Sequence, residues 1–413
     1  MERTYPKAYI TEKGERALRG GHPWVYAEEI TDISGEYENG GLVDVFSKKS
    51  RFLGTGFIND NSKIRIRVIS RNANDKFDRA FYERRIRYAL EYRRTVMGGD
   101  FSCCRLIFGE ADTFPGLTVD RFGDILVTQV LSLGIERIKD MLFELLVQVL
   151  EEMGEKITAI YERNDVGLRT KEGMEEYKAF YRPDENSALT KLRTVLSGVT
   201  EITENGIRYT VDYINGQKTG FFLDQKYNRM AIRQIAKGKT VLDCFTHTGA
   251  FALNAAAAGA KLVNAVDISA EAVEMTRKNA ELNGLTANME FTKADVFDLL
   301  TELFNKGGHP YEFIILDPPA FTKSSSTVKN AERGYKEINM KAMKLLGRGG
   351  YLATCSCSHF MTEPLFKKML HDAAADAGVS LRQIEARRQS PDHPILWNVP
   401  ETDYLKFYIF QVV

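Results

Sequence analysis

The chain has 413 residues, and its 56 Lys and Arg equal its 56 Asp and Glu, so its formal net charge is zero. A composition of 44% hydrophobic and 27% charged residues is typical of packed globular protein and excludes disordered, collagenous and disulfide-scaffold classes. The amino-terminal segment is charged and no apolar run approaches about 18 residues, so we expect a cytoplasmic protein without a signal peptide or membrane contact. Because the net charge is zero, any polyanion is expected to bind at a local basic patch.

Residues 1–74 are predicted to form a small β-barrel. Three β-rich runs are separated by polar turns: 41–47, 51–58 and 63–70. Three cations alternate with apolar residues in the last of these runs: Lys63, Arg65 and Arg67. Because successive side chains of a strand point to opposite faces, this run is expected to present a basic face to a polyanion.

Residues 75–190 are predicted to form a linker helix and a central α+β domain. The segment 76–95 has apolar residues at helical spacing and many cations, a pattern typical of a solvated helix face that also suits a polyanion partner. Two strands joined by a Gly-Asp turn are expected within 116–130, an amphipathic helix over 136–154 and a further strand over 156–163.

Residues 191–413 are predicted to form an α/β domain introduced by a β-hairpin. The dipeptide Asn205-Gly206 between two alternating runs is the strongest local signal for such a hairpin. From residue 238 onward, near-continuous apolar strands alternate with helices, which indicates a doubly wound, Rossmann-like parallel sheet. Two final β-type runs, 382–389 and 404–413, are expected to pair as an antiparallel edge.

The five cysteines predict a reducing compartment rather than a disulfide framework. They lie at positions 103, 104, 244, 355 and 357. Neither the adjacent pair nor the C-x-C pair has the C-x-x-C spacing of structural zinc sites, and the sequence has no H-E-x-x-H motif. We therefore expect no metal.

Polar residues follow three successive strands of the predicted sheet, at the carboxyl ends where such sheets bind ligands. The first strand ends at Asp243, and one glycine, Gly249, opens the next helix. Without the further glycines of a dinucleotide site, this loop disfavours an oxidoreductase and suits an adenosine ligand that has no phosphate, such as S-adenosylmethionine. Asp267 and Asp295 end the next two strands, where acids can meet ribose hydroxyls and the adenine amino group. Each acid alone is equally explained as a helix N-cap or turn residue, but the succession favours a ligand crevice.

The fourth and fifth strands end in reactive side chains. The fourth ends at Asp317, followed by two prolines that hold the chain in an extended turn. The fifth places Cys355 and Cys357 on one face, with Cys357 nearer the crevice. Cys355 is expected to be a small buried hydrophobe, an interpretation that stays open for Cys357. A thiol beside a methyl donor has a chemical use, because its thiolate can add to carbon 6 of cytosine and make carbon 5 nucleophilic.

Eight segments spread over all three predicted domains carry a family pattern: HPWVYAEEI at 22–30, GEADTFPGLTVDRFGD at 109–124, ERNDVGLR at 162–169, GQKTGFFLDQ at 216–225, DCFTHTGAF at 243–251, LDPPAF at 316–321, CSCS at 355–358 and HPILWNVPETDYLK at 393–406. In these segments the chain resembles the RlmI-like family of bacterial 23S ribosomal RNA cytosine-C5 methyltransferases. The resemblance implies an RNA-binding PUA-like domain, a small central domain and a class I S-adenosylmethionine-dependent methyltransferase domain. It also implies 23S ribosomal RNA as the substrate, either naked or in a partly assembled large subunit.

The resemblance further implies a role for individual residues. The cofactor-binding positions would be Phe222, Asp224 and Gln225 around the pocket, Asp243, Thr246, Gly249 and Ala250 under the methionine part, Asp267 and Ser269 at the ribose, and Asp295 and Val296 at the adenine. Asp317 would lie between the cofactor and the base, and Cys357 would be the nucleophile. The PUA-like domain would bind RNA, which agrees with the basic run that contains Lys63, Arg65 and Arg67.

One position departs from the pattern of two-cysteine RNA cytosine-C5 enzymes. Those enzymes have a cysteine after the fourth-strand proline that helps to release the product, whereas this chain has Ala320 there. The base that removes the carbon 5 proton is then Asp317, Cys355 or a bound water. Two other functions stay open: methylation of guanine N7 without a covalent adduct, and a non-catalytic assembly factor that binds RNA. A homodimer is one option for the oligomeric state.

Overall fold

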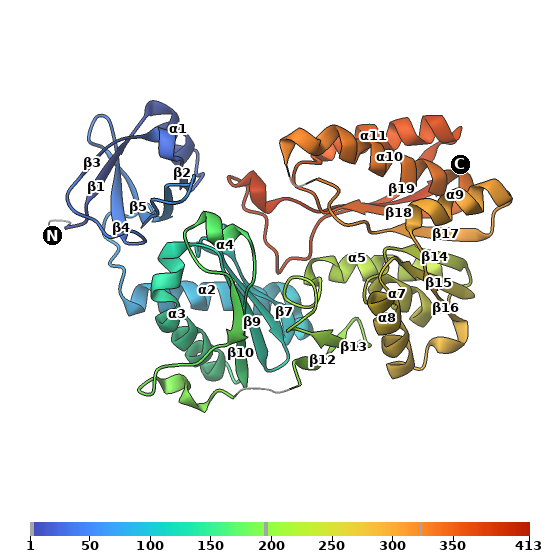
Figure 1. Cartoon of the computed structure of the whole chain (residues 1–413), viewed down its shortest axis with the longest axis horizontal. Helices are drawn as coiled ribbons and strands as arrows, with labels where there is room; N and C mark the ends of the chain where they lie inside the picture. Colours follow the sequence, from blue (N-terminus) through green and yellow to red (C-terminus); the bar gives the residue numbers. More distant parts are fainter. Residues whose placement is uncertain (1–3, 194–196, 323) are drawn as a thin grey trace. The chain divides into compact units, whose positions relative to one another are not determined.

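A computed structural model of the chain describes residues 4–193, 197–322 and 324–413. Contacts divide the chain into two compact units (Figure 1). Unit 1 comprises Met1–Glu201, Val211–Leu223 and Pro391–Thr402, and unit 2 comprises Ile202–Thr210, Asp224–Ser390 and Asp403–Val413. The predicted domain boundaries near residues 74 and 190 stay predictions. Within the described ranges, no helix combines the length and the apolar character needed to cross a membrane.

The amino-terminal part of unit 1 is a six-stranded sheet in the order β2-β6-β5-β4-β1-β3. Its elements are β1 (Lys7–Ile10), α1 (Glu12–Arg19), β2 (Trp24–Val25), β3 (Ile30–Ser34), β4 (Leu42–Ser47), β5 (Phe52–Ile58) and β6 (Ile66–Ser70). Neighbouring strands are antiparallel except β1 and β4, which are parallel. Buried aliphatic side chains such as Ile10, Leu18 and Val45 form its core.

The structure differs from the sequence expectation at the basic strand face. Strand β6 begins at Ile66, so Lys63 and Arg65 lie before the strand, Lys63 exposed and Arg65 partly exposed. Arg67 is inside the strand and only 7% exposed, and its guanidinium pairs with Glu172 at 2.9 Å. The prediction of an alternating basic face was wrong because β6 lies between β2 and β5, where a cation becomes buried and requires a carboxylate partner. The RNA-binding roles of the three cations stay predictions.

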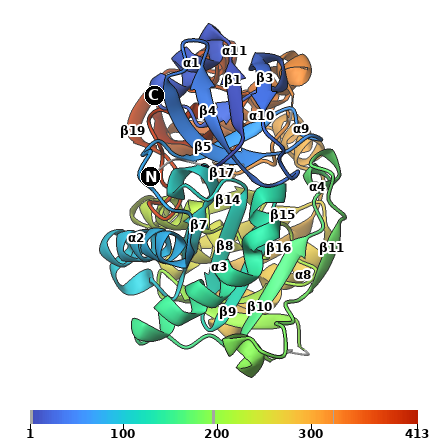
Figure 2. The same ribbon diagram turned by 90° about the vertical axis from the view of Figure 1, so that its left-hand side faces the viewer.

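The central part of unit 1 is a five-stranded mixed sheet in the order β11-β10-β9-β8-β7. Its elements are α2 (Arg79–Met97), β7 (Cys103–Phe108), β8 (Leu117–Phe122), β9 (Ile125–Val130), α3 (Leu133–Glu152), β10 (Ala159–Asn164), α4 (Leu168–Lys171) and β11 (Tyr177–Phe180). Helices α2 and α3 pack against each other and against this sheet (Figure 2). The predicted helices and strands of this region are therefore confirmed. Helix α2 is not only a solvated face, because Arg93 is fully buried and pairs with Asp112.

The predicted hairpin is present as β12 (Val199–Glu204) and β13 (Ile207–Asp212), which form a two-stranded sheet. Asn205 and Gly206 both have positive φ angles, 55° and 76°. Two consecutive positive φ angles are the requirement of a type I′ turn, which explains why this dipeptide is such a strong signal.

Unit 2 contains a seven-stranded sheet in the order β16-β15-β14-β17-β18-β20-β19. Its strands are β14 (Thr240–Cys244), β15 (Leu262–Asp267), β16 (Met289–Lys293), β17 (Tyr311–Leu316), β18 (Leu346–Ser356), β19 (Leu381–Arg387) and β20 (Lys406–Val412). The first five in this spatial order are parallel, as the doubly wound prediction requires. The two final strands are antiparallel as predicted, but only β19 is an edge strand, because β20 inserts between β18 and β19.

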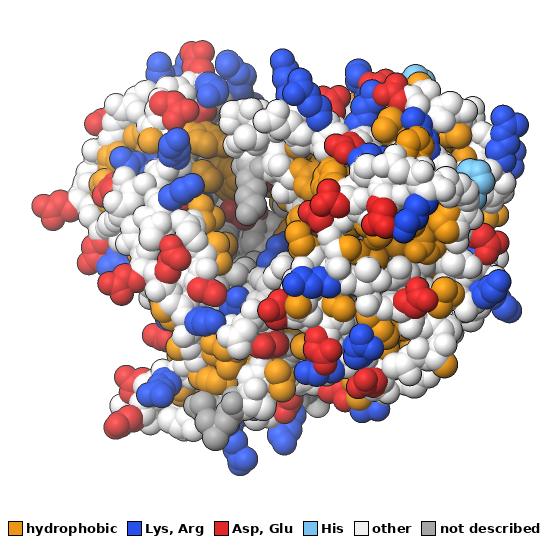
Figure 3. Space-filling view, turned by 45° about the vertical axis from the view of Figure 1, so that its right-hand side comes forward, with side chains coloured by type: hydrophobic (Ala, Val, Ile, Leu, Met, Phe, Trp, Pro, Cys, Tyr) orange, Lys and Arg blue, Asp and Glu red, His pale blue; other side chains and the backbone are white. Residues whose placement is uncertain are grey.

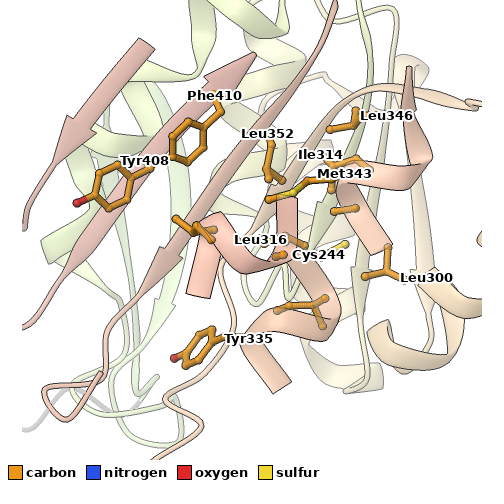
Figure 4. Packing of buried hydrophobic residues seen from close by; sticks show 14 of the residues in the cluster. Cys244, Leu300, Ile314, Leu316, Tyr335, Met343, Leu346, Leu352, Tyr408 and Phe410 are labelled. Atoms are coloured by element: carbon orange, nitrogen blue, oxygen red, sulfur yellow. The ribbon is translucent and has the colours of Figure 1, made fainter. Parts of the chain in front are cut away.

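Helices connect the strands of unit 2. They are α5 (Lys226–Ala231), α6 (Arg233–Ala236), α7 (Ala250–Ala257), α8 (Ala270–Leu282), α9 (Val296–Lys306), α10 (Val328–Leu345) and α11 (Glu363–Ala377). Side chains of α9, α10 and α11 pack with those of the strands in one buried cluster that includes Leu316, Tyr335 and Leu352 (Figure 4). This packing fixes the strands whose carboxyl ends carry the candidate site.

On one face of the molecule, charge is distributed as the neutral composition suggests (Figure 3). On the face shown in Figure 3, basic and acidic side chains are interspersed rather than gathered into one large patch. A polyanion that approaches this face would therefore meet local contacts and not a broad positive field.

Candidate functional site

The carboxyl ends of the parallel strands bring the predicted crevice residues to one edge of the unit 2 sheet. Asp243 is the penultimate residue of β14, and Asp267 is the last residue of β15. Asp295 follows β16 by two residues, Asp317 directly follows β17, and Cys357 directly follows β18. The five strands occur where the sequence predicted them, although Asp295, Asp317 and Cys357 lie just beyond their strands. The roles of these residues in binding and catalysis stay predictions.

Asp243 is fully buried and carries one unsatisfied oxygen. Its Oδ2 accepts hydrogen bonds from the Thr246 hydroxyl at 2.6 Å and from the Ala252 amide at 3.0 Å. Its Oδ1 has no hydrogen-bond partner among the described residues. Burial raises the pKa of this carboxyl to about 7, and the charges of Asp317 and Asp267 contribute to the rise. Because a buried polar atom without a partner is costly, Asp243 fits a ligand that brings a hydrogen-bond donor, such as the amino group of S-adenosylmethionine.

The loop between β14 and α7 is strained and firmly held. Phe245 and His247 have φ angles of 64° and 53°, in a region that residues other than glycine rarely occupy. The His247 amide donates to Asp267 Oδ2 at 3.0 Å, which ties the loop to the end of β15. Gly249 has a φ of 81°, and a Cβ atom there would lie 2.5 Å from Thr276 Cγ2, so only glycine fits. The sequence indicated the role of Gly249, but it did not indicate the positive φ angles of Phe245 and His247.

Asp267 and Asp295 have the turn and N-cap roles that the sequence offered as an alternative for each acid, and Ser269 also caps a helix. Asp267 Oδ1 accepts from the Ser269 amide at 3.0 Å. The Ser269 hydroxyl caps α8 by accepting from Ala272, and Asp295 caps α9 by accepting from Phe297 at 2.8 Å. A carboxylate has about four acceptor positions, so these bonds leave capacity for a ribose or adenine contact.

Gln225 lies at the reactive end of the crevice. Its Nε2 donates to Asp317 Oδ1 at 3.1 Å and to Cys355 Sγ at 3.4 Å. The neighbouring Asp224 is buried and accepts from the Tyr404 hydroxyl at 2.7 Å. The structure thus brings Gln225 together with the catalytic candidates.

Three other cofactor candidates differ in their surroundings. Ala250 and Val296 are buried at the first positions of α7 and α9. Phe222 belongs to unit 1, where Lys218 Nζ lies 5.0 Å from the centre of its ring. Their contacts with a cofactor stay predictions.

Cys355 and Asp317 form a buried hydrogen-bonded pair. The Cys355 thiol donates to Asp317 Oδ1 at 2.8 Å. Burial raises the pKa of both groups, and the nearby Asp317 charge raises that of Cys355 further. Cys355 is buried as predicted, but it is not a simple apolar residue, because its thiol bonds to the carboxyl that is a candidate catalytic group. The sequence could not predict this bond, because it depends on the distance between the two side chains in the folded chain.

Cys357 is the accessible thiol of the chain. All five cysteines lie among the described residues, and Cys357 alone is partly exposed while the other four are buried. It directly follows the last residue of β18, so it lies just beyond the strand in which the sequence predicted it. His359, two residues further on, is exposed at the surface.

Two further residues, Lys406 and Trp397, were not identified from the sequence. Lys406, the first residue of β20, is buried at 3% exposure, and its Nζ donates to the carbonyl oxygens of Ser358 at 2.6 Å and Tyr404 at 2.8 Å. The signal in the sequence is a lysine that opens an otherwise apolar run. Trp397 in unit 1 is 96% exposed. Within the described ranges, no cluster of three or more metal-binding side chains occurs.

Comparisons with known proteins agree with this geometry. A family model described as S-adenosylmethionine-dependent methyltransferase matches residues 171–410, and one described as a PUA-like domain matches residues 8–71. The ribosomal RNA large subunit methyltransferase I of Klebsiella pneumoniae is 38% identical over 411 residues, which is 99% of both proteins. The protein of the same name from Pseudoalteromonas translucida is 40% identical over 406 residues, which is 98% of both.

Solved structures show the same fold. A protein of Streptococcus mutans assigned as a SAM-dependent methyltransferase has a TM-score of 0.79 at 22% identity and covers 98% of this chain and 100% of its own. A second methyltransferase structure, complexed with SAH, has a TM-score of 0.81 at 22% identity over the same shares of the two chains.

Proposed function

We propose that this chain, which belongs to the ribosomal RNA large subunit methyltransferase I family of S-adenosylmethionine-dependent methyltransferases, methylates carbon 5 of a cytosine in 23S ribosomal RNA through a covalent adduct at Cys357. The observation that carries the proposal is the position of Cys357: a partly exposed thiol at the carboxyl end of β18, beside the buried pair of Cys355 and Asp317. The cytoplasm is the expected location, because that is where bacterial ribosomal RNA is found.

The cofactor-binding residues would act through hydrogen bonds and shape. Asp243 would accept from the amino group of the methionine part, and the loop that ends at Gly249 would leave room for it. Asp267 and Asp295 would accept from the ribose and the adenine. When bound, S-adenosylmethionine supplies a methyl group on a positively charged sulfur, which is an electrophile.

Cys357 would act as the nucleophile. Cytosine carbon 5 is a weak nucleophile, and addition of the thiolate to carbon 6 breaks the 5,6 double bond and places electron density on carbon 5. After carbon 5 has received the methyl group, loss of its proton restores the double bond and expels the thiolate. The C–S bond is therefore formed and broken once in each cycle, and the enzyme is regenerated.

Asp317 is the group that we assign to proton transfer near the base. Its carboxyl is buried, and it already accepts hydrogen bonds from Gln225 and Cys355, so its orientation is fixed. Burial raises its pKa, which makes its carboxylate a stronger base than an exposed aspartate. In this role Asp317 would take the place of the second cysteine of the two-cysteine enzymes, at whose position this chain has Ala320.

RNA recognition would fall to unit 1. Lys63 and the cation Lys171 line a cavity of about 660 Å³ together with Trp24. Trp397 offers an exposed ring to an unpaired base, and its segment is held in place because Asp392 accepts from the Arg105 amide at 2.8 Å. Aromatic stacking and a few cations suit a local contact with single-stranded RNA.

The test is methylation of large-subunit RNA by purified protein, followed by mass spectrometry of the nucleosides. Cys357→Ala is expected to abolish 5-methylcytidine formation while cofactor affinity, measured by calorimetry, stays at the wild-type value. Cys355→Ala is the matched control, and it is expected to retain part of the activity. Wild-type activity in Cys357→Ala, or 7-methylguanosine as the product, would contradict the proposal.

A further inference from the structure

Lys406 is a buried cation that the reaction scheme above does not use. The register of β18 and β20 places it opposite Ser356, the residue before Cys357. Its Nζ donates to the carbonyl oxygen of Ser358, the residue after Cys357, at 2.6 Å. The same Nζ also donates to the carbonyl oxygen of Tyr404 at 2.8 Å. The ammonium group is thus fixed at the backbone that carries the proposed nucleophile.

No carboxylate forms an ion pair with the buried ammonium group of Lys406 in the part of the chain that the structure describes. The nearby Asp403 pairs with Arg388 at 3.4 Å. A buried ammonium that is not compensated by a carboxylate is unfavourable. Its remaining partners are backbone carbonyl oxygens, which accept hydrogen bonds but do not neutralise the charge.

The pKa of Lys406 depends on burial and on four charged or titratable groups near it. Burial lowers the pKa of Lys406 to about 8, while Cys357, Asp403 and Cys355 raise it and Arg388 lowers it. An amine with this pKa is still mostly protonated at neutral pH. Among the groups that raise it, Cys357 contributes most, and its neighbours in the chain, Ser356 and Ser358, are the residues that Lys406 faces and binds.

We propose that Lys406 is a positioning residue that stabilises the thiolate form of Cys357. The S–H bond of Cys357 breaks so that both electrons stay on sulfur and the proton leaves to solvent, while Lys406 keeps its three protons. The thiolate is then available for addition to carbon 6. This inference rests on the proposed function for the use of the thiolate, but not for its formation.

The test is alkylation of Cys357 by iodoacetamide in the full chain, without RNA or cofactor. The thiolate displaces iodide to form a C–S bond, so the rate at each pH reports the thiolate fraction. The rate would be measured between about pH 5.5 and about pH 9.5 by mass spectrometry of the peptide that contains Cys357. The other cysteines are buried, and Cys355, which lies on the same peptide as Cys357, is distinguished from it by fragmentation of that peptide in the mass spectrometer.

The wild-type rate is expected to rise with an inflection below about 8.5, the ordinary value for cysteine. In Lys406→Gln, which keeps an amide donor but removes the charge, the inflection should move up by about one pH unit or more, and the rate at neutral pH should fall about tenfold. Lys406→Arg restores the charge and should bring the inflection back toward the wild-type value. Lys406→Met is the second neutral variant, and cofactor binding verifies that each variant is folded.

A wild-type inflection above about 8.5, or a folded neutral variant with the wild-type pH profile, would overturn the inference. The first of these outcomes needs no variant, so it decides the question even if the substitutions prevent folding. The proposed function fails separately, if Cys357→Ala still methylates cytosine. Alkylation and methylation therefore distinguish an error about Lys406 from an error about Cys357.

Discussion

Asp243→Asn tests the reading of the buried carboxyl on β14. The amide oxygen can keep the hydrogen bonds from Thr246 and Ala252, while an NH2 group replaces the unsatisfied Oδ1. Above neutral pH the buried Asp243 carboxyl must ionise at a cost in free energy, and the asparagine amide does not, so the substitution should stabilise unit 2 there. An amide donor at that position should also repel the donor of a bound cofactor and weaken cofactor binding by about 1 to 3 kcal/mol.

The magnitude follows from the pKa of Asp243. Burial raises it from 3.8 to about 7, a difference of about three pH units, and each unit corresponds to about 1.36 kcal/mol. A raised pKa means that the folded state binds the proton more tightly than the unfolded state. Stability from this group is therefore present below about pH 4 and is lost as the pH rises to about 7, by an amount on the order of 4 kcal/mol.

The assay is the free energy of unfolding of unit 2 between about pH 4 and about pH 8. Urea titrations read by hydrogen exchange of peptides from β14 and β15 would give it, and peptides of β8 in unit 1 serve as the internal reference. The difference between Asp243→Asn and the wild type should grow with pH and level off above about 7. A difference that stays constant over this range would refute the reasoning.

Three further substitutions test the packing and the RNA contact. Glu172→Ala should destabilise unit 1 by about 3 to 5 kcal/mol in urea unfolding, because Arg67 would stay buried without its partner. Gly249→Ala should destabilise unit 2 by about 1 to 3 kcal/mol, whereas Gly259→Ala, with a similar φ of 86° but open space at the Cβ position, should cost less. Trp397→Ala should weaken binding of single-stranded RNA by about 1 to 3 kcal/mol in fluorescence anisotropy.

Each of these has a result that would contradict it. Wild-type stability in Glu172→Ala would show that the buried pair contributes nothing. Equal losses in the two glycine variants would show that backbone strain, and not the contact with Thr276, explains the need for glycine at 249. Unchanged RNA affinity in Trp397→Ala would remove the exposed ring from the proposed interface.

The sequence predicted the elements that depend on local rules. The Asn205-Gly206 hairpin follows from the backbone angles that its turn requires, and the alternation of strands and helices after residue 238 follows from hydrophobic periodicity. The positions of Asp243, Asp267 and Asp317 at strand ends follow from the same pattern, because carboxyl ends of parallel strands meet at one edge.

What the sequence did not predict depends on tertiary neighbours. Alternation suggested that Arg67 faces solvent, but the neighbours of β6 bury it against a glutamate far along the chain. Cys355 was expected to be apolar, and its bond to Asp317 joins two strands. Lys406 gave no signal beyond its place in an apolar run, because its role depends on a register between β18 and β20 that no local pattern encodes.

The central claim is that Cys357 forms a covalent bond with carbon 6 of a cytosine. RNA in which the target cytidine carries fluorine at carbon 5 tests it directly, because carbon 5 then has no proton to lose after methylation and the adduct cannot resolve. Incubation with wild-type protein and S-adenosylmethionine should give a stable protein–RNA complex, and mass spectrometry should place the crosslink on the peptide that contains Cys357. The same complex in Cys357→Ala, or no complex with wild-type protein that methylates unmodified RNA, would contradict the account.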